Sequence, residues 1–263
     1  MAVVALYTDF PAQDFYAGLL KARLVSLIPH IQIIDVVHGL PLSDANRAGV
    51  ILENVWSAFP VGTIHLMALT RLEGAYAHVA FAHEGQFFVG TDIGQFSLGL
   101  QQAVKSAKDV SHLPGGEGTF PALDLFAKLV QLIVGGANPN SWDVPEVALV
   151  DTMFPQPSEK KNEDGSLQIR GHILYIDGYG NVITNISRDY FNYWGEKRRF
   201  SIHLRYRKHT LNRISQRYSD EAEGNVVAVF NAQQFLEIGF VGGSLVQYFG
   251  LQVQDNVTVE FLP

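Results

Sequence analysis

Short apolar runs alternate with helical patterns through the first half of the chain, and this alternation limits the fold more than any other feature. The runs 3–7, 31–37 and 63–69 have the composition of buried strands, whereas 14–26 and 43–58 place apolar residues at helical spacing. Strands that are joined by helices run parallel to one another. The pattern therefore predicts an α/β domain with a mostly parallel sheet that is covered by helices.

Three further features complete this first domain. Ser43 is the expected N-cap of the second helix. The runs 79–81 and 86–90 flank His83-Glu84-Gly85 and predict a hairpin of two strands. The stretch 120–134 is amphipathic and is followed by two glycines, which predicts a helix that ends there.

A polar stretch at 156–166 separates two halves of different character. It is rich in charged residues, follows Pro155 and contains Pro157, so we expect a linker between a domain at 1–155 and a domain at 167–263. The second half has few helical patterns, which predicts a smaller antiparallel β-barrel. Its predicted strands are 168–176, 182–186, 200–206, 225–230, 235–240 and 257–261.

Charge and composition exclude several classes of function. The formal net charge is −7, and basic residues are scattered apart from a cluster between Lys197 and Lys208 that we interpret as a solvated surface. Nucleic-acid binding needs a basic face, so we expect no nucleic-acid partner. The chain has no cysteine, which excludes disulfides and cysteine nucleophiles. No apolar stretch of about 18 residues occurs, and we expect a cytoplasmic protein with no membrane partner.

Common catalytic signatures are missing from the sequence. It has no G-x-x-x-x-G-K loop, no G-x-G-x-x-G after the first strand, no G-x-S-x-G elbow and no H-E-x-x-H. None of the nine histidines pairs with a second ligand at a spacing typical of metal sites. We therefore expect no metal.

Two aspartates follow the first predicted strand. Asp9 ends that strand, and ligands of open α/β sheets bind outside the carboxyl ends of the strands, so its carboxylate is placed to accept hydrogen bonds from a ribose diol. Asp14 begins the following helix. It has two interpretations, a ligand-binding carboxylate or a carboxylate that the helix dipole favours.

The segment Asp177-Gly178-Tyr179-Gly180-Asn181 lies between two predicted strands and has the composition of a turn. The strand that follows places Thr184 and Asn185 among apolar residues, where polar groups need partners. This second feature favours a role beyond a turn.

Blocks along the chain give a more specific result. GHILYIDGYGNVITNIS at 171–187 and ALYTDFPAQDFYAGLLKARLVSLIPHIQIIDVVHGL at 5–40 resemble two signatures of the S-adenosylmethionine (SAM) hydroxide adenosyltransferase and SAM-dependent halogenase family. FPVGTIH at 59–65, FVGTDIG at 88–94 and NAQQFLEI at 231–238 resemble further family blocks in the same order. The resemblance thus spans almost the whole chain.

The resemblance implies an N-terminal α/β domain that binds the adenosyl group, a C-terminal β-barrel and a homotrimer whose sites lie between subunits. SAM would be the substrate, with no additional cofactor. By position, Asp9 matches the ribose-binding residue of the family, and Asp14 matches a residue near the methionine portion. The remaining matches are Asp177, Asn181, Asn231 and Gln233, of which the last two fall in a block that fits the family only in part.

The catalytic positions depart from the family. Hydroxide-transferring members carry an Asp, an Arg and a His that orient water, but here MALTRLEGAYA at 67–77 has Thr70 at the Asp position and no clear counterpart of the Arg. TFPALD at 119–124 has Pro121 at the His position and keeps Asp124. Proline has no titratable group, so the usual water-orienting set cannot operate.

The halogenase site is not matched either. Thr70 is a weak candidate for a substitute catalytic residue, together with Arg71, Glu73 or Tyr76. The alternative is that these residues form an exposed loop. His38 has two interpretations, a histidine that is hydrogen-bonded to the backbone or a ligand contact, and His65 is interpreted as a core or interface residue. Neither is assigned a catalytic role.

Three hypotheses follow. The first is an enzyme that cleaves SAM at C5′ with water and releases adenosine and methionine. The second is a SAM or adenosine binding protein that has lost the chemistry. The third, a structural trimer without a ligand, is disfavoured because Asn181 and Asn185 would then have no evident purpose.

Overall fold

The computed structural model describes residues 1–70, 76–195, 198–204 and 210–263. Arg71, Glu73 and the first residue of the basic cluster, Lys197, lie outside the described residues. The chain divides into two compact units, Met1–Met153 and Phe154–Pro263, and each is described separately.

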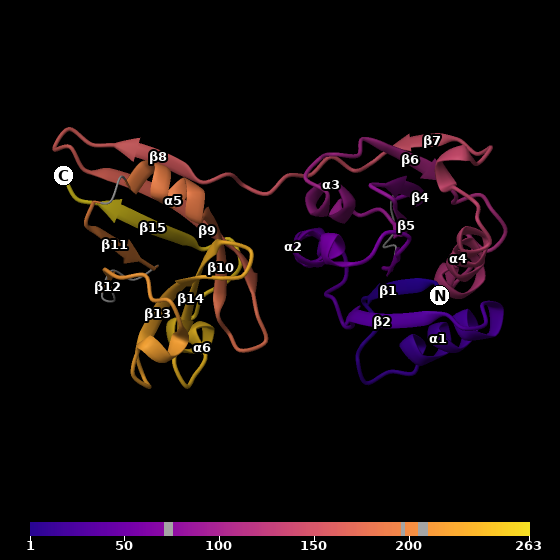
Figure 1. The fold of residues 1–263 in the computed structure, drawn as a ribbon, viewed down its shortest axis with the longest axis horizontal. Coiled ribbons are helices and arrows are strands. Elements are labelled where there is room, and N and C mark those ends of the chain that lie inside the picture. Colours follow the sequence, from indigo (N-terminus) through magenta and orange to yellow (C-terminus); the bar gives the residue numbers. More distant parts are fainter. Residues whose placement is uncertain (71–75, 196–197, 205–209) are drawn as a thin grey trace. The chain divides into compact units, whose positions relative to one another are not determined.

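The first unit contains a seven-stranded sheet with the order β2-β1-β3-β5-β4-β6-β7 (Figure 1). Four neighbouring strands are parallel, as predicted, and the other three are antiparallel additions that extend the sheet on one side. The parallel strands are β1 (Val3–Thr8), β2 (Gln32–Val37), β3 (Ile64–Ala68) and β5 (Gln86–Thr91). The others are β4 (His78–His83), β6 (Ser106–Asp109) and β7 (Glu146–Ala148).

Helices cover both faces of this sheet because its central strands are apolar on both sides. Val4 and Leu6 of β1 pack with one helix layer, and Ala5 and Tyr7 pack with the other, which follows from the alternation of side chains along a strand. The layers are α1 (Tyr16–Leu27) with α4 (Ala127–Val134), and α2 (Ala45–Val55) with α3 (Gln95–Gly99) (Figure 1).

Several predicted boundaries need correction. The first helix begins at Tyr16, so Asp14 precedes the helix instead of starting it. Asp44, and not Ser43, caps α2, because the Asp44 carboxylate accepts a hydrogen bond from the backbone N–H of Arg47 at 2.9 Å. The expected helix 120–134 begins with a π-helical turn, Ala122–Phe126, before α4. Short 3₁₀ turns lie at Trp56–Ala58 and Pro139–Ser141.

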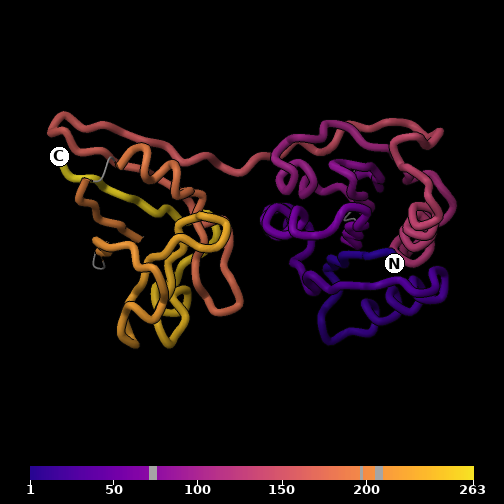
Figure 2. Tube along the Cα trace, in the orientation of Figure 1, coloured from indigo at the N-terminus to yellow at the C-terminus, as the bar shows by residue number. Residues whose placement is uncertain are grey.

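The second unit is an antiparallel, nearly closed barrel with the strand order β12-β11-β15-β9-β10-β14-β13 and with β8 paired to β9. The long strand β9 pairs with β15 through its first part and with β10 through its last part, so it joins the two sides of the barrel. Figure 2 follows the chain through these strands. The strands are β8 (Ser158–Lys161), β9 (Leu167–Ile176), β10 (Val182–Ser187), β11 (Phe200–His203), β12 (Thr210–Leu211), β13 (Val226–Phe230), β14 (Phe235–Phe240) and β15 (Asn256–Phe261).

Two helices that the sequence did not predict pack onto the barrel core. They are α5 (Arg188–Gly195), which contributes Phe191, and α6 (Leu245–Phe249), which contributes Leu245. A 3₁₀ turn also lies at Tyr218–Asp220. The stretch 156–166, which we expected as a linker, contains β8, and this strand adds an edge to the second unit through its pairing with β9.

The polar residues of β10 have structural partners. The Thr184 hydroxyl donates to the Leu236 carbonyl at 3.0 Å. The Asn185 amide accepts from the backbone N–H of His172 and donates to the Pro155 carbonyl. The expectation that Asn185 would have no role in a protein without a ligand is therefore wrong. Its side chain holds the segment that leads into the barrel by hydrogen bonds.

His65 is confirmed as a core residue. Its ring is fully buried, with Nδ1 3.0 Å from the Tyr7 hydroxyl and Nε2 2.6 Å from Oε1 of Gln86, and it stacks on the Phe88 ring. Burial lowers the pKa of His65 to about 4, although the hydrogen bond with Gln86 acts in the opposite direction. The folded protein therefore holds this imidazole in its neutral form at neutral pH.

Because this imidazole is buried in its neutral form, we expect the folded protein to lose stability in acid. In the unfolded chain His65 takes up a proton near its ordinary pKa of 6.5, whereas the folded state resists protonation until about pH 4. The contribution of His65 to stability is present above pH 6.5 and is lost as the pH falls to 4, by about 3 kcal/mol in the free energy of unfolding. Urea unfolding between pH 7.5 and 4.5 measures it.

The effect is isolated by comparing the wild type with His65→Gln, which cannot titrate. Asp9 and Asp92 have raised pKa values and act in the opposite direction at low pH, but they are common to both proteins. The matched control is His30→Asn, since His30 is exposed and should leave the pH dependence unchanged. Equal losses of stability in the wild type and His65→Gln would contradict the assignment.

Candidate functional site

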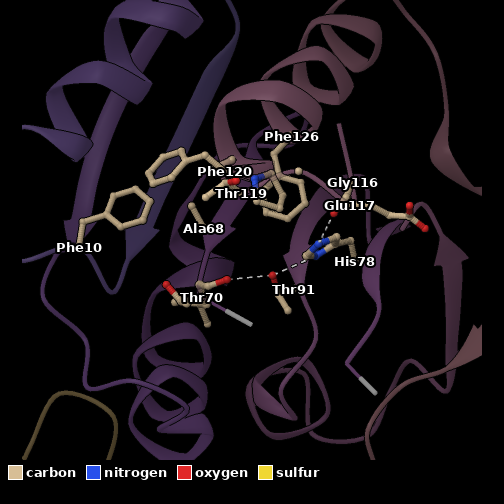
Figure 3. Close-up of a pocket in the computed structure, with 14 residues that line it drawn as sticks. Phe10, Ala68, Thr70, His78, Thr91, Gly116, Glu117, Thr119, Phe120 and Phe126 are labelled. Atoms are coloured by element: carbon tan, nitrogen blue, oxygen red, sulfur yellow. Dashed lines mark hydrogen bonds between the residues drawn. The ribbon is translucent and has the colours of Figure 1, made fainter. Parts of the chain in front are cut away.

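A cavity of about 370 Å³ lies in the first unit, next to the carboxyl ends of β1, β3 and β5 (Figure 3). This edge of a parallel sheet is where ligands of open α/β folds bind. The loop before the π-helical turn closes the other side. The described lining residues are Phe10, Ala68, Leu69, Thr70, His78, Thr91, Gly116, Glu117, Gly118, Thr119, Phe120, Pro121, Ala122 and Phe126.

Asp9 lies directly after β1 and beside this cavity, between the lining residue Phe10 and the end of the strand. It is 8% exposed, and its Oδ2 accepts a hydrogen bond from the backbone N–H of Thr70 at 2.5 Å. Its Oδ1 is buried and has no hydrogen-bond partner among the residues that the structure describes. Burial raises the pKa of Asp9, and the hydrogen bonds with Thr70 partly oppose that shift.

An unpartnered buried carboxylate oxygen is costly, because the group has lost its hydration without a replacement. Donors from a ligand would remove that cost. Asp9 therefore has a structural sign of ligand binding.

The candidate catalytic residue Thr70 lines the cavity, but its backbone N–H is already bound to Asp9. Tyr76 is half-buried and packs with the apolar core of the unit. Pro121 lines the same cavity and precedes the π-helical turn. Thr70 and Pro121, the two positions at which the resemblance predicts a departure from the family, thus line one cavity.

Stacked aromatic rings form one wall of the cavity. The Phe120 ring lies 5.4 Å from the ring of Phe10 and 5.1 Å from the ring of Tyr16, both in stacked geometry. This wall of the cavity is therefore apolar and aromatic.

His78 and Thr91 form a polar pair on the opposite side of the cavity that was not predicted from the sequence (Figure 3). Nδ1 of His78 is 3.1 Å from the Thr91 hydroxyl, and Nε2 is 3.2 Å from the Gly116 carbonyl. The ring is 2% exposed and meets the Phe126 ring edge-on. A histidine at the start of an otherwise apolar strand was the available signal.

A second set of polar residues lies in the barrel unit, at the turn between β9 and β10. Oδ1 of Asp177 accepts from the backbone N–H groups of Tyr179 and Asn181, and Oδ2 accepts from the Asn181 side chain, each at 2.9 Å. The segment is therefore a turn, as its composition indicated, and it also brings two predicted binding residues together.

Tyr218 and Glu237 join this turn around a cavity of about 710 Å³. The Tyr218 hydroxyl donates to Oε1 of Glu237 at 2.6 Å. Burial and the adjacent carboxylate raise the pKa of Tyr218. A glutamate inside the apolar strand 235–240 was the sequence signal for this pair.

Three other predicted binding residues lie apart from these sets. Asn231 holds the β13–β14 turn, where its Oδ1 accepts from the N–H groups of Gln233 and Phe235, and Gln233 is exposed. The pairing of Val182 with Ile238 places this turn at the opposite end of β14 from Asn181. Asp14 is exposed, and its Oδ1 accepts from the next N–H.

His38 has one structural hydrogen bond, with Nδ1 2.8 Å from the Thr8 hydroxyl. Its Nε2 is buried and makes no hydrogen bond with the described residues, and the nearest carboxylate oxygen is Oδ1 of Asp35 at 3.3 Å. In the described part of the chain, no three His, Asp or Glu side chains are grouped to hold a metal ion. No helix within those residues is long and apolar enough to cross a membrane.

Comparison with protein families gives two collinear matches. Residues 4–143 match the N-terminal domain of SAM hydroxide adenosyltransferase, and residues 171–258 match its C-terminal domain. The chain belongs to the SAM hydroxide adenosyltransferase family. The lining residues Thr70 and Pro121 therefore lie within a matched family domain.

Two relatives of this family member cover nearly its whole length. A (R)-S-adenosyl-L-methionine hydrolase of Thermus thermophilus is 26% identical, with 96% of this chain and 97% of the relative aligned. A protein of the same name from Methanocaldococcus jannaschii is 24% identical, with 98% of this chain and 95% of the relative aligned.

Two solved structures share the fold. An uncharacterized conserved protein from Thermotoga maritima has a TM-score of 0.80 at 20% identity, covering 98% of this chain and 99% of that one. A conserved hypothetical protein from Thermus thermophilus has a TM-score of 0.73 at 24% identity, covering 98% and 100%.

The turn at Asp177 depends on one glycine. Gly180 has φ +83°, and a Cβ at this position would lie 2.0 Å from the Ser244 hydroxyl oxygen. We expect Gly180→Ala to lower the free energy of unfolding by about 1–3 kcal/mol, because the backbone is left-handed and the space is filled. Thermal or urea unfolding measures the change.

Gly178→Ala is the matched control in the same turn. Gly178 has no atom within 4 Å of an added Cβ and no positive φ, so its replacement should change stability little. Equal effects of the two substitutions would show that the geometry of position 180 is not the reason.

Proposed function

We propose that the protein binds SAM and hydrolyses it to adenosine and methionine by attack of water at C5′. Membership of the family and the printed names of two full-length relatives support this activity. The observation that carries the proposal is the buried Oδ1 of Asp9 at the carboxyl end of β1, which has no hydrogen-bond partner among the described residues.

A ribose diol fits this carboxylate. Its two hydroxyls are donors, and hydrogen bonds to a desolvated carboxylate stabilise the ionised form that burial disfavours. The cavity beside Asp9 has the aromatic wall of Phe10 and Phe120, which suits a small organic ligand.

In the second unit, Asp177 and Asn181 are proposed to bind the amino-acid portion of SAM. Their side chains line a cavity together with Tyr218 and Glu237. Asp14, Asn231 and Gln233 remain predictions as binding residues, because nothing in their contacts points to a ligand.

Displacement at a sulfonium centre needs an oriented nucleophile more than a covalent intermediate. Holding water against C5′ and excluding other water can account for much of such catalysis. The reaction therefore does not require the residues of the family at positions 70 and 121.

Those same positions favour a second candidate function. Thr70 and Pro121 replace an acid and an imidazole in the cavity, as expected for a SAM or adenosine receptor without turnover. Binding is common to both functions, and turnover separates them.

Asp9→Ala tests the binding part. Loss of the hydrogen bonds between the carboxylate and the ribose hydroxyls should weaken adenosine and SAM binding by ~1.5–3 kcal/mol, a tenfold to hundredfold rise in Kd. Calorimetry measures this change. Asp143→Ala, which replaces an exposed aspartate that does not line the cavity, is the control and should bind as the wild type does.

A chromatographic assay for adenosine released from SAM tests turnover. Pro121→His alone should not create or restore activity, because a single imidazole lacks the matching acid and Arg. Binding of neither ligand by the wild type would refute both functions. Binding without turnover would select the receptor.

The proposal includes a homotrimer in which different subunits supply the two halves of each site, and a cytoplasmic location. Mixed trimers test the first point. If Asp9→Ala and Asp177→Ala chains are unfolded and refolded together, some sites combine an intact first unit of one copy with an intact second unit of another. Such a mixture should recover binding that each variant alone has lost.

Refolding of each variant by itself is the control for this experiment, and light scattering gives the mass of the assembly. No recovery in a mixture that has formed mixed trimers would mean that one subunit supplies both halves. A stable monomer at micromolar concentration would remove the trimer from the proposal.

A further inference from the structure

The segment that follows β2 holds the chain on both sides of Asp9. The backbone N–H of Gly39 donates to the Phe10 carbonyl at 2.8 Å, and the N–H of Leu40 donates to the Thr8 carbonyl at 3.2 Å. Asp9 lies between these two carbonyl groups in the chain. The backbone position of Asp9 therefore depends on the end of β2 as well as on β1.

A β-bulge gives the end of β2 this position. β2 is the edge strand next to β1, and the two pair in parallel register as far as Leu6 opposite Asp35 (Figure 1). The next pair is Tyr7 opposite Val37, so β2 has one extra residue there. Bulges are rare in parallel pairs and frequent next to active sites, where they re-aim the side chains that follow. Here the bulge brings His38, in place of Val37, beside the last residue of β1.

The bulge also changes the face of the sheet on which His38 lies. Residues three apart in a regular strand point to opposite faces. Because of the extra residue, Asp35 and His38 instead meet on one face, with Oδ1 of Asp35 3.3 Å from Nε2 of His38. On this face, Oδ2 of Asp35 accepts a hydrogen bond from Nζ of Lys21 in α1 at 2.6 Å. A chain of contacts thus runs from α1 through β2 to the imidazole.

At the other end of this chain the imidazole meets Thr8, the residue before Asp9. Nδ1 of His38 lies 2.8 Å from the Thr8 hydroxyl, and Thr8 is fully buried. A buried hydroxyl that loses its hydrogen bond costs free energy. Without the imidazole, the end of β1 would lower that cost by shifting until the hydroxyl met another partner.

We propose that His38 is a positioning residue for Asp9 in the ribose site. His38 holds the side chain of Thr8, while Gly39 and Leu40 hold the backbone around Asp9, so the carboxylate has a fixed direction before the ligand arrives. A group that is already held in its binding orientation loses less conformational freedom on binding, and this tightens the complex. The described lining of the cavity does not include His38, so His38 acts through Asp9. This role depends on the proposed function, because the ribose diol is the ligand that Asp9 would bind.

His38→Phe tests the role, because phenylalanine keeps an aromatic ring and has no hydrogen-bonding atom in its side chain. We expect Kd for adenosine, measured by calorimetry, to rise by about threefold to tenfold, as for the loss of one hydrogen bond. In His38→Asn the amide lies close to the position of Nδ1 and can pair with the Thr8 hydroxyl, so the rise should stay below about twofold. His112→Phe, at an exposed histidine of the same unit, is the matched control and should bind as the wild type does.

His38→Phe combined with Asp9→Ala distinguishes positioning from other effects on the cavity. If His38 acts through Asp9, its replacement should change Kd for adenosine by less than about twofold once the carboxylate is gone. A residue that affects the cavity independently of Asp9 would weaken binding by the same factor in both backgrounds. Melting temperatures verify that each variant is folded.

Thr8→Val and Thr8→Ser test the same contact from the other side, and they replace the first test if His38→Phe does not fold. Thr8→Val removes the hydroxyl and keeps the shape, so it should raise Kd about as much as His38→Phe does. The two substitutions together should raise Kd no further, because they remove one shared contact. Thr8→Ser keeps a hydroxyl and should bind within about twofold of the wild type.

The outcomes separate this role from the proposed function. If the wild type binds adenosine and Kd is unchanged in His38→Phe and Thr8→Val, the role of His38 is wrong and the proposed function stands. The same holds if His38→Phe causes its full loss of affinity in the Asp9→Ala background. A wild type that binds neither adenosine nor SAM would overturn both.

Discussion

The buried carboxylate of Asp9 at the end of β1 is the constraint on which the candidate site of the first unit depends. Parallel pairing of β1 with β3 brings the chain after each strand to the same edge of the sheet, so the N–H of Thr70 reaches Oδ2 across 61 residues of sequence. That bond fixes the direction of the carboxylate and leaves Oδ1 buried without a described partner. Burial of this oxygen without a hydrogen bond costs free energy, and a ligand that donates a hydrogen bond to it would remove that cost.

The same sheet positions a cluster of polar groups on one wall of the cavity. β5 lies beside β3 in parallel, which places Thr91 next to the carbonyl of Leu69, and β4 pairs antiparallel with β5, which places His78 opposite Thr91. Three strands therefore deliver one acceptor, one hydroxyl and one imidazole to a single wall. The barrel unit uses a different device, a tight turn in which the Asp177 carboxylate satisfies three N–H donors and presents Asn181.

The family matches and the residues that line the cavity give different information about this protein. The matches to both family domains establish the family, whereas the chemistry of the cavity depends on its own lining residues, among them Thr70 and Pro121. Catalysis by orientation tolerates a change at these two positions if another group takes the proton.

The sequence by itself determined the α/β sheet, the antiparallel barrel, the turn at Asp177 and the position of Asp9, because strand and helix periodicity and turn chemistry are local. The sequence predicted Ser43 as the N-cap of α2, whereas Asp44 caps it. Both residue types are good N-caps, and the backbone conformation decides which of the two neighbours takes that position. The sequence also could not reveal that Asn185 is structural, that Asn231 is used in its own turn or that His78 faces Thr91. Those facts depend on contacts between residues distant in the chain, which only strand pairing and packing decide.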